Sequence, residues 1–245
     1  FEKFFKIYGR CKFKLQYSKK NMGFKLKDLN QEIIKFDLGQ NFRDDDFYVS
    51  KSNKHIFDFL NEWPSWEKNF LNISGEKFSG KTHLINIFLK KYNGFKIDSN
   101  LLNNNHLKII KNYKNIVLEN LSKKIKEDLF FALYNIIEQD DKYLIVTSSK
   151  SIVDIDFDLI DLKSRSKNFI LHNIEKPDDE LIFALILKNF SDRQISLDKK
   201  LIHYIIKRID RSYGKISDFI YKIDEVSLKK KRSIDLKIIK EVLGD

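Results

Sequence analysis

The chain has 245 residues, a formal net charge of +11 and a single cysteine, Cys11. This length can bury a sizeable core, and one cysteine excludes the small disulfide-stapled scaffolds of secreted proteins. The sequence has no apolar run of about 18 residues, so we expect no transmembrane helix and a cytoplasmic protein. Abundant Lys and Asn with only 2 Pro are typical of an AT-rich coding sequence, so the charge is a weak indication of nucleic-acid binding.

The N-terminal residues 1–21 are strongly basic, with seven Lys or Arg and one Glu. Met22 is the only methionine of the chain. We therefore expect the natural protein to begin at Met22. The alternative is that residues 1–21 form a genuine basic arm.

The predicted elements alternate along the middle of the chain. Short apolar runs typical of strands lie at 70–73, 95–97, 116–118, 143–147 and 169–171, and helical periodicity lies between them at 81–92, 100–111, 123–138 and in a segment ending near Arg165. This pattern predicts an α/β fold with a five-stranded parallel sheet between helices. After Pro177, helices without strands are predicted at 178–189, 197–209, 215–229 and 235–243. We expect an N-terminal extension (1–40), a nucleotide-binding domain (41–175) and a helical lid domain (176–245).

A phosphate-binding motif follows the first predicted strand. Residues 75–82 read Gly-Glu-Lys-Phe-Ser-Gly-Lys-Thr and fit G-x-x-x-x-G-K-[ST] at the start of a predicted helix. In such a loop backbone N–H groups surround the phosphates, Lys81 reaches the terminal phosphates and the Thr82 hydroxyl binds Mg²⁺. A chance match in a turn is disfavoured because both flanking elements fit. The candidate nucleotide-binding residues here are Gly75, Glu76, Lys77, Phe78, Ser79, Gly80, Lys81, Thr82 and His83.

A phosphate-loop domain followed by a helical lid is the layout of AAA+ ATPases. Over about residues 30–245 the chain resembles their DnaA-related members, specifically the regulatory Hda family. The landmarks occur in family order at 46–49, 63–66, 75–84, 147–150, 161–165 and 207–212. The Trp-Pro-Ser-Trp turn at 63–66 resembles alphaproteobacterial members, although aromatic residues in a turn are also typical of local packing. The resemblance implies an AAA+ fold that binds ADP or ATP with Mg²⁺.

A buried strand that ends in acids should complete the nucleotide site, because carboxylates orient Mg²⁺ and activate the attacking water. Glu119 lies where the metal-orienting acid is expected, so it is a candidate catalytic and metal residue. Asn120 follows, and an amide cannot act as a base, so self-catalysed hydrolysis should be slow or absent. The alternative is that Glu119 is an ordinary acid at a strand end.

The resemblance implies two sensor positions, and this sequence matches one of them and lacks the expected residue at the other. Ser149 matches the family's γ-phosphate sensor, and it could equally be a helix N-cap. Gly214 stands where the resemblance implies a lid arginine, and the adjacent Lys215 is a poor substitute because it lacks the planar fork of a guanidinium. Discrimination between ATP and ADP through the lid is therefore in doubt.

Residues 161–165 resemble the family's arginine-finger box and make Arg165 a candidate catalytic residue. Such a finger acts on the γ-phosphate of a neighbouring subunit and raises the rate on the order of 10³–10⁵. The alternative is a surface arginine paired with Asp161, which would contribute little.

The resemblance also implies a sliding-clamp-binding peptide near the N-terminus. The candidate at 33–38 keeps the apolar anchors Ile34, Phe36 and Leu38, but Gln31 lies two residues early, and an ordinary amphipathic strand is an equal alternative. The resemblance implies that the protein, together with the DNA-loaded clamp, promotes hydrolysis of the ATP bound to DnaA. It could act as a monomer or a homodimer, and it would contact DNA only through the clamp. The alternatives are an autonomous ATPase such as a helicase loader, and a DnaA-like DNA-binding adaptor.

Overall fold

The computed structural model describes residues 47–193, 195, 197–230 and 232–244. The candidate clamp peptide and the basic N-terminal residues lie outside this range. The predictions for Ile34, Phe36 and Leu38 therefore stay predictions.

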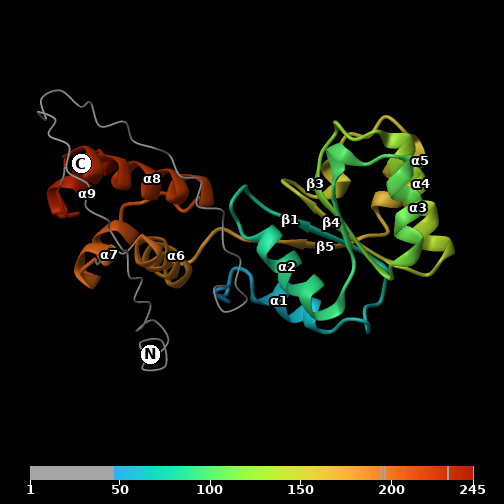
Figure 1. The fold of residues 1–245 in the computed structure, drawn as a ribbon, viewed down its shortest axis with the longest axis horizontal. Coiled ribbons are helices and arrows are strands. Elements are labelled where there is room, and N and C mark those ends of the chain that lie inside the picture. Colours follow the sequence, from blue (N-terminus) through green and yellow to red (C-terminus); the bar gives the residue numbers. More distant parts are fainter. Residues whose placement is uncertain (1–46, 194, 196, 231, 245) are drawn as a thin grey trace, which may run out of the picture. The chain divides into compact units, whose positions relative to one another are not determined.

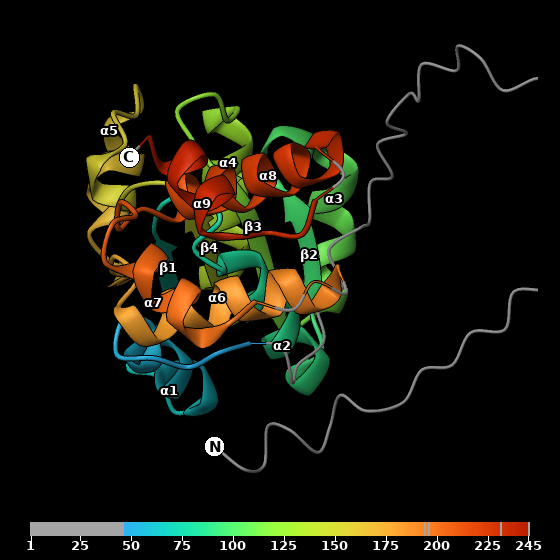
Figure 2. The ribbon, with the colours of Figure 1, turned by 90° about the vertical axis from the view of Figure 1, so that its left-hand side faces the viewer.

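Five parallel strands form one sheet, as predicted. They are β1 (Phe70–Ser74), β2 (Phe95–Asp98), β3 (Asn115–Leu121), β4 (Tyr143–Ser148) and β5 (Ile170–Asn173). The spatial order is β2-β3-β4-β1-β5, and Figure 2 shows β1, β4, β3 and β2 side by side. Because all pairs are parallel, the carboxyl ends of the strands meet at one edge. The predicted functional residues lie at this edge, at the end of β3 and just after β1 and β4.

Helices cover both faces of the sheet (Figure 1). On one face lie α1 (Lys54–Asn61) and α2 (Lys81–Tyr92), and on the other lie α3 (Asn104–Ile109), α4 (Glu127–Gln139) and α5 (Ile160–Ser166). Successive strand residues alternate between the two sides: Phe70 stacks on Tyr134 of α4 at 4.2 Å, and Leu71 packs in the cluster of α1 and α2. Strands buried on both faces explain the nearly continuous apolar runs in the sequence.

The C-terminal helices form a separate core. They are α6 (Asp179–Asp192), α7 (Lys199–Ile206), α8 (Tyr213–Lys230) and α9 (Leu236–Leu243), and no strand occurs in the described part of this region. Aspartates fix three of the starts: the carboxylates of Asp178, Asp198 and Asp235 each accept a hydrogen bond from a backbone N–H in the first turn. The predicted succession of helices after Pro177 is thereby confirmed.

One predicted helix is shorter than expected. The sequence predicted a helix at 100–111, whereas α3 spans six residues between the 3₁₀ turns η2 (Ser99–Leu101) and η3 (Ile110–Asn112). The reason is Asn103, whose side chain caps the helix by accepting from the N–H groups of Asn105 and His106. A further 3₁₀ turn, η4 (Ile152–Asp154), follows β4. Among the described residues, no helix is long and apolar enough to cross a membrane.

Candidate functional site

The phosphate-loop motif lies between β1 and α2, at the carboxyl edge of the sheet. The geometry of the loop explains why glycine occupies positions 75 and 80. A Cβ at Gly75 would lie 2.9 Å from Ser79 Oγ, closer than real Cβ contacts allow. Gly80 has φ +91°, a left-handed conformation that glycine adopts without strain. The loop is therefore tight, and its backbone can approach a ligand closely.

Phe78 is an unexpected feature of the loop. Its φ is +69°, and its side chain is 48% exposed beneath the ammonium of Lys77, which lies 4.9 Å from the ring centre. A bulky residue in the left-handed region is a genuine outlier and costs about 1–2 kcal/mol. The motif treats this position as free, so sequence reasoning missed the strain.

Lys81 points back into the loop. Its Nζ donates to the carbonyl oxygens of Gly75 (2.7 Å) and Glu76 (2.8 Å) and lies 3.3 Å from Ser79 Oγ. Burial lowers the pKa of Lys81, and the charge of Glu76 opposes this shift. An ammonium held by loop carbonyls is in the right place to meet an anion at the loop.

Thr82 and His83 begin α2 directly after Lys81. Thr82 is half-buried, whereas His83 is buried with its ring edge-on to Phe47 at 5.2 Å. His83 thus packs beneath the loop, and its role in nucleotide binding stays a prediction.

Glu119 lies at the end of β3 with an incompletely satisfied carboxylate. It is only 9% exposed, and its Oε1 is buried without a hydrogen-bond partner among the described residues. Its Oε2 lies 3.4 Å from Lys96 Nζ, which also donates to Asn86 on α2. A buried, unpaired carboxylate oxygen fits a bound Mg²⁺ or its water. No cluster of three metal-ligating side chains occurs in the described part of the chain.

Asn120 occupies a bulge where the pairing of β3 with β4 shifts register. It has φ +58°; its backbone N–H donates to Thr147 Oγ1, and its side-chain amide donates to Asp98 Oδ2 at 2.6 Å. Burial would raise the pKa of Asp98, but the hydrogen bonds from Asn120 and Asn100 outweigh it and lower the pKa. Asp98 was missed in the sequence, although it ends β2 directly beside Glu119 in the register.

Ser149 lies just past β4 and lines a cavity of about 120 Å³ with Lys123, Lys150 and Asp156. The N-cap alternative is wrong, because η4 begins at Ile152 with Ser151 at its cap position. The sensor role of Ser149 stays a prediction. Lys215 is exposed, and its backbone N–H lies 3.4 Å from Ser212 Oγ.

Asn72 fixes the turn that carries Ser149, and sequence reasoning missed it. This side chain is fully buried in β1, between β4 and β5. Its amide nitrogen donates to Ser148 Oγ at 2.9 Å, and its amide oxygen accepts from the Ile152 N–H at 2.9 Å. The one available signal is an Asn inside an otherwise apolar strand, since a buried amide needs partners.

Arg165 lies on α5 and contacts α4. Its Nη1 is 3.0 Å from Glu138 Oε2, and the guanidinium lies over the rings of Phe131 (4.9 Å) and Tyr134 (4.6 Å). The alternative pairing with Asp161 is wrong, because the partner is Glu138. With 28% of its side chain exposed, Arg165 is more covered than its predicted place at an exposed edge implied.

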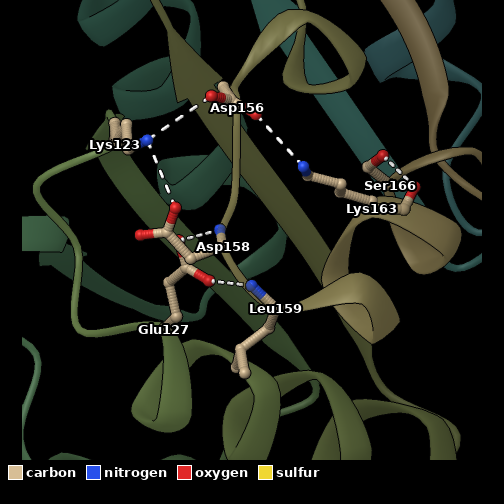
Figure 3. Close-up of polar contacts among 7 residues, drawn as sticks. All are labelled: Lys123, Glu127, Asp156, Asp158, Leu159, Lys163 and Ser166. Atoms are coloured by element: carbon tan, nitrogen blue, oxygen red, sulfur yellow. Dashed lines mark hydrogen bonds and ion pairs between the residues drawn. The ribbon is translucent and has the colours of Figure 1, made fainter.

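A polar network holds the start of α5 (Figure 3). The Glu127 carboxylate accepts from the backbone N–H groups of Asp158 (2.8 Å) and Leu159 (2.7 Å). Asp156 links Lys123 (3.5 Å) with Lys163 (3.1 Å). Together with the Arg165–Glu138 pair, these contacts attach α5 to its surroundings at both ends.

The Trp-Pro-Ser-Trp turn is part of an aromatic cluster. The Trp66 ring stacks on Phe59 at 5.2 Å and donates from Nε1 to the Phe59 carbonyl oxygen, while Trp63 packs against Tyr92 at 4.6 Å. These contacts agree with local packing. The alphaproteobacterial type stays a prediction.

Comparisons with known proteins agree with this architecture. A family model described as "Hda, lid domain" matches residues 178–243. The chain is 24% identical over 234 residues to the chromosomal replication initiator protein DnaA of Caldanaerobacter subterraneus subsp. tengcongensis, covering 85% of this chain and 53% of the relative. It is 22% identical to DnaA of Buchnera aphidicola subsp. Cinara cedri, covering 94% and 59%. The chain spans about half the length of these curated relatives.

Solved structures share the fold. Domain III of Thermotoga maritima DnaA has a TM-score of 0.66 at 18% identity, covering 84% of this chain and 97% of that one. AMPPCP-bound DnaA from Aquifex aeolicus has a TM-score of 0.61 at 21% identity, covering 80% and 71%. The Thermotoga maritima RuvB branch-migration motor has a TM-score of 0.62 at 14% identity, covering 80% and 69%. In sheet order and phosphate loop the chain is similar to these DnaA-related AAA+ proteins, and its residues 178–243 match the lid domain of the Hda family.

Proposed function

We propose that this protein binds ADP or ATP with Mg²⁺ at residues 75–82 and regulates replication initiation. In this proposal it acts with the DNA-loaded sliding clamp and promotes hydrolysis of the ATP that DnaA holds. Its own nucleotide has a structural role. The protein is cytoplasmic and contacts DNA through the clamp.

The observation that carries the proposal is the position of Arg165. Its guanidinium is held on α5 by Glu138 and two aromatic rings of α4, so a planar cation is presented from a fixed helix. A guanidinium supplied to a neighbouring active site stabilises the charge that develops on transferring phosphoryl oxygens. Asn120 supports the same reading, because its amide is bonded to Asp98 and cannot take a proton from water.

The remaining site residues have binding roles in this proposal. The loop N–H groups and Lys81 bind the phosphates, while Thr82 and Glu119 hold Mg²⁺, which would neutralise phosphate charge. Ser149, just past β4, and Lys215, in the first turn of α8, contact the nucleotide in this proposal. Residues 41–175 form the nucleotide-binding domain and 176–245 the lid. Ile34, Phe36 and Leu38, within the extension 1–40, bind the clamp.

The test measures conversion of labelled ATP to ADP on purified DnaA with clamp-loaded DNA, with and without this protein. We expect stimulation that Arg165→Ala reduces on the order of 10³-fold or to background. Lys163→Ala is the matched control: it removes a cation of the same helix that pairs with Asp156, and it should retain stimulation. Full activity of Arg165→Ala would refute the finger assignment.

Two further measurements separate the alternatives. ATP turnover by the isolated protein would favour an autonomous ATPase, such as a helicase loader. DNA binding without the clamp would favour a DNA-binding adaptor. Asn120 argues against the first, and no observation in the described chain favours the second.

A further inference from the structure

A carboxylate of the phosphate loop contacts the lid. The Glu76 side chain reaches the start of α8, where its Oε1 accepts from the Ser212 hydroxyl and from the Gly214 N–H at 3.1 Å. Its Oε2 accepts from the Tyr213 N–H at 3.1 Å. One side chain of the nucleotide loop thus accepts three hydrogen bonds from the lid.

These bonds complete the N-terminus of α8. The first helical N–H groups have no partner within a helix and need capping. Glu76 accepts from Tyr213 and Gly214, the Ser212 hydroxyl lies 3.4 Å from the Lys215 N–H, and the Ser212 carbonyl accepts from Ile216. An anion at the positive end of this 18-residue helix is also favoured by the helix dipole.

Gly214 makes room for this contact. A Cβ at Gly214 would lie 3.1 Å from Glu76 Oε1, tighter than nearly all real Cβ contacts. A larger residue there, an arginine included, would require the carboxylate to shift by a few tenths of an ångström. The acid in the loop and the glycine in the lid therefore fit each other.

Glu76 also touches the lysine of the nucleotide site. Its carbonyl oxygen accepts from Lys81 Nζ at 2.8 Å, while its carboxylate caps α8. A ligand that draws Lys81 away from this carbonyl acts on the same residue that holds the lid. Burial alone would raise the pKa of Glu76, but the bonds from Ser212, Gly214 and Tyr213 lower it, so the cap is charged at neutral pH.

We propose that Glu76 is a positioning residue that holds the lid on the phosphate loop, so that the protein's own carboxylate replaces contact between a lid arginine and the terminal phosphate. The proposal extends the proposed nucleotide site. It implies that the lid stays closed equally over ATP and ADP, because a ligand shifts a conformational equilibrium only through differential contacts. Loss of the carboxylate should loosen the lid for both nucleotides alike.

The first test needs no nucleotide. Hydrogen exchange of the amides at residues 213–216 is measured by mass spectrometry in the full chain and in Glu76→Ala and Glu76→Gln. Loss of a helix cap predicts about fivefold less protection in Glu76→Ala, and a smaller loss in Glu76→Gln, which keeps one acceptor. Glu175→Gln is the matched control, because it removes the charge of an exposed acid beside the lid and keeps the backbone carbonyl that accepts from the Tyr213 hydroxyl. Unchanged protection in Glu76→Ala would overturn the proposal.

The second test measures dissociation of fluorescent ATP and ADP analogues. In Glu76→Ala both should leave about fivefold faster with their ratio unchanged. Faster dissociation of the ATP analogue alone would show that Glu76 acts through the terminal phosphate, and it would refute the proposal that Glu76 holds the lid. If neither analogue binds the unmodified protein, the proposed function fails. The hydrogen-exchange experiment still tests whether Glu76 holds the lid.

A double-mutant cycle adds an independent check. Gly214→Ala should reduce protection of the α8 amides in the unmodified background, because its Cβ meets Glu76 Oε1. In the Glu76→Ala background that obstacle is gone, and alanine is the better helix former. Additive effects of the two substitutions would contradict direct coupling of these residues.

Discussion

Replacing Phe78 tests whether the phosphate loop stores backbone strain. An L-residue in the left-handed region costs about 1–2 kcal/mol, which glycine avoids. Glycine in turn loses about 0.5–1 kcal/mol through the greater entropy of its unfolded chain. Because Phe78→Ala keeps the strain and removes the ring, its comparison with Phe78→Gly isolates the backbone term. We expect the glycine variant to be more stable than the alanine variant by about 0.5–1 kcal/mol.

The measurement is urea unfolding followed by circular dichroism, comparing midpoints at equal slope. Lys77→Gly and Lys77→Ala form the matched control, because Lys77 has no positive φ. There the order should reverse, with alanine more stable by about 0.4–1 kcal/mol. If Phe78→Ala equals or exceeds Phe78→Gly in stability, the loop carries no strain at this residue and the reasoning is refuted.

Three further outcomes are expected. Asn72→Ala leaves the buried N–H of Ile152 without its partner and should lower stability by about 1–3 kcal/mol in urea unfolding; an unchanged midpoint would contradict this role. Arg165→Ala should lower stability by less than about 2 kcal/mol, since it loses one exposed pair and its ring contacts, so a larger drop in thermal melting would mark Arg165 as structural. The folded pKa of Asp98 lies below its ordinary 3.8, so its contribution is full above 3.8 and fades as pH falls through the folded pKa. The stability difference between the unmodified protein and Asp98→Asn should therefore shrink on acidification, and a constant difference would contradict the shift.

The nucleotide loop was predictable because its chemistry is local. The motif at residues 75–82 fixes where backbone, lysine and hydroxyl lie relative to one strand and one helix, and the structure has β1 and α2 on either side. Asp98 was not predictable in the same way, since it joins Asn120 only through the pairing of β2 with β3. Arg165 was identified by resemblance, but its partner Glu138 lies 27 positions away and was missed.

The sequence by itself determined the strand and helix succession, the phosphate loop and the absence of a base at Asn120, because periodicity and motif spacing act over a few neighbouring residues. Only the tertiary structure decided which side chains far apart in the sequence contact each other. The Glu76 carboxylate caps α8 from 137 positions away, and Phe78 adopts a left-handed backbone that the surrounding loop imposes. Such contacts depend on how elements pack, and no local pattern encodes them.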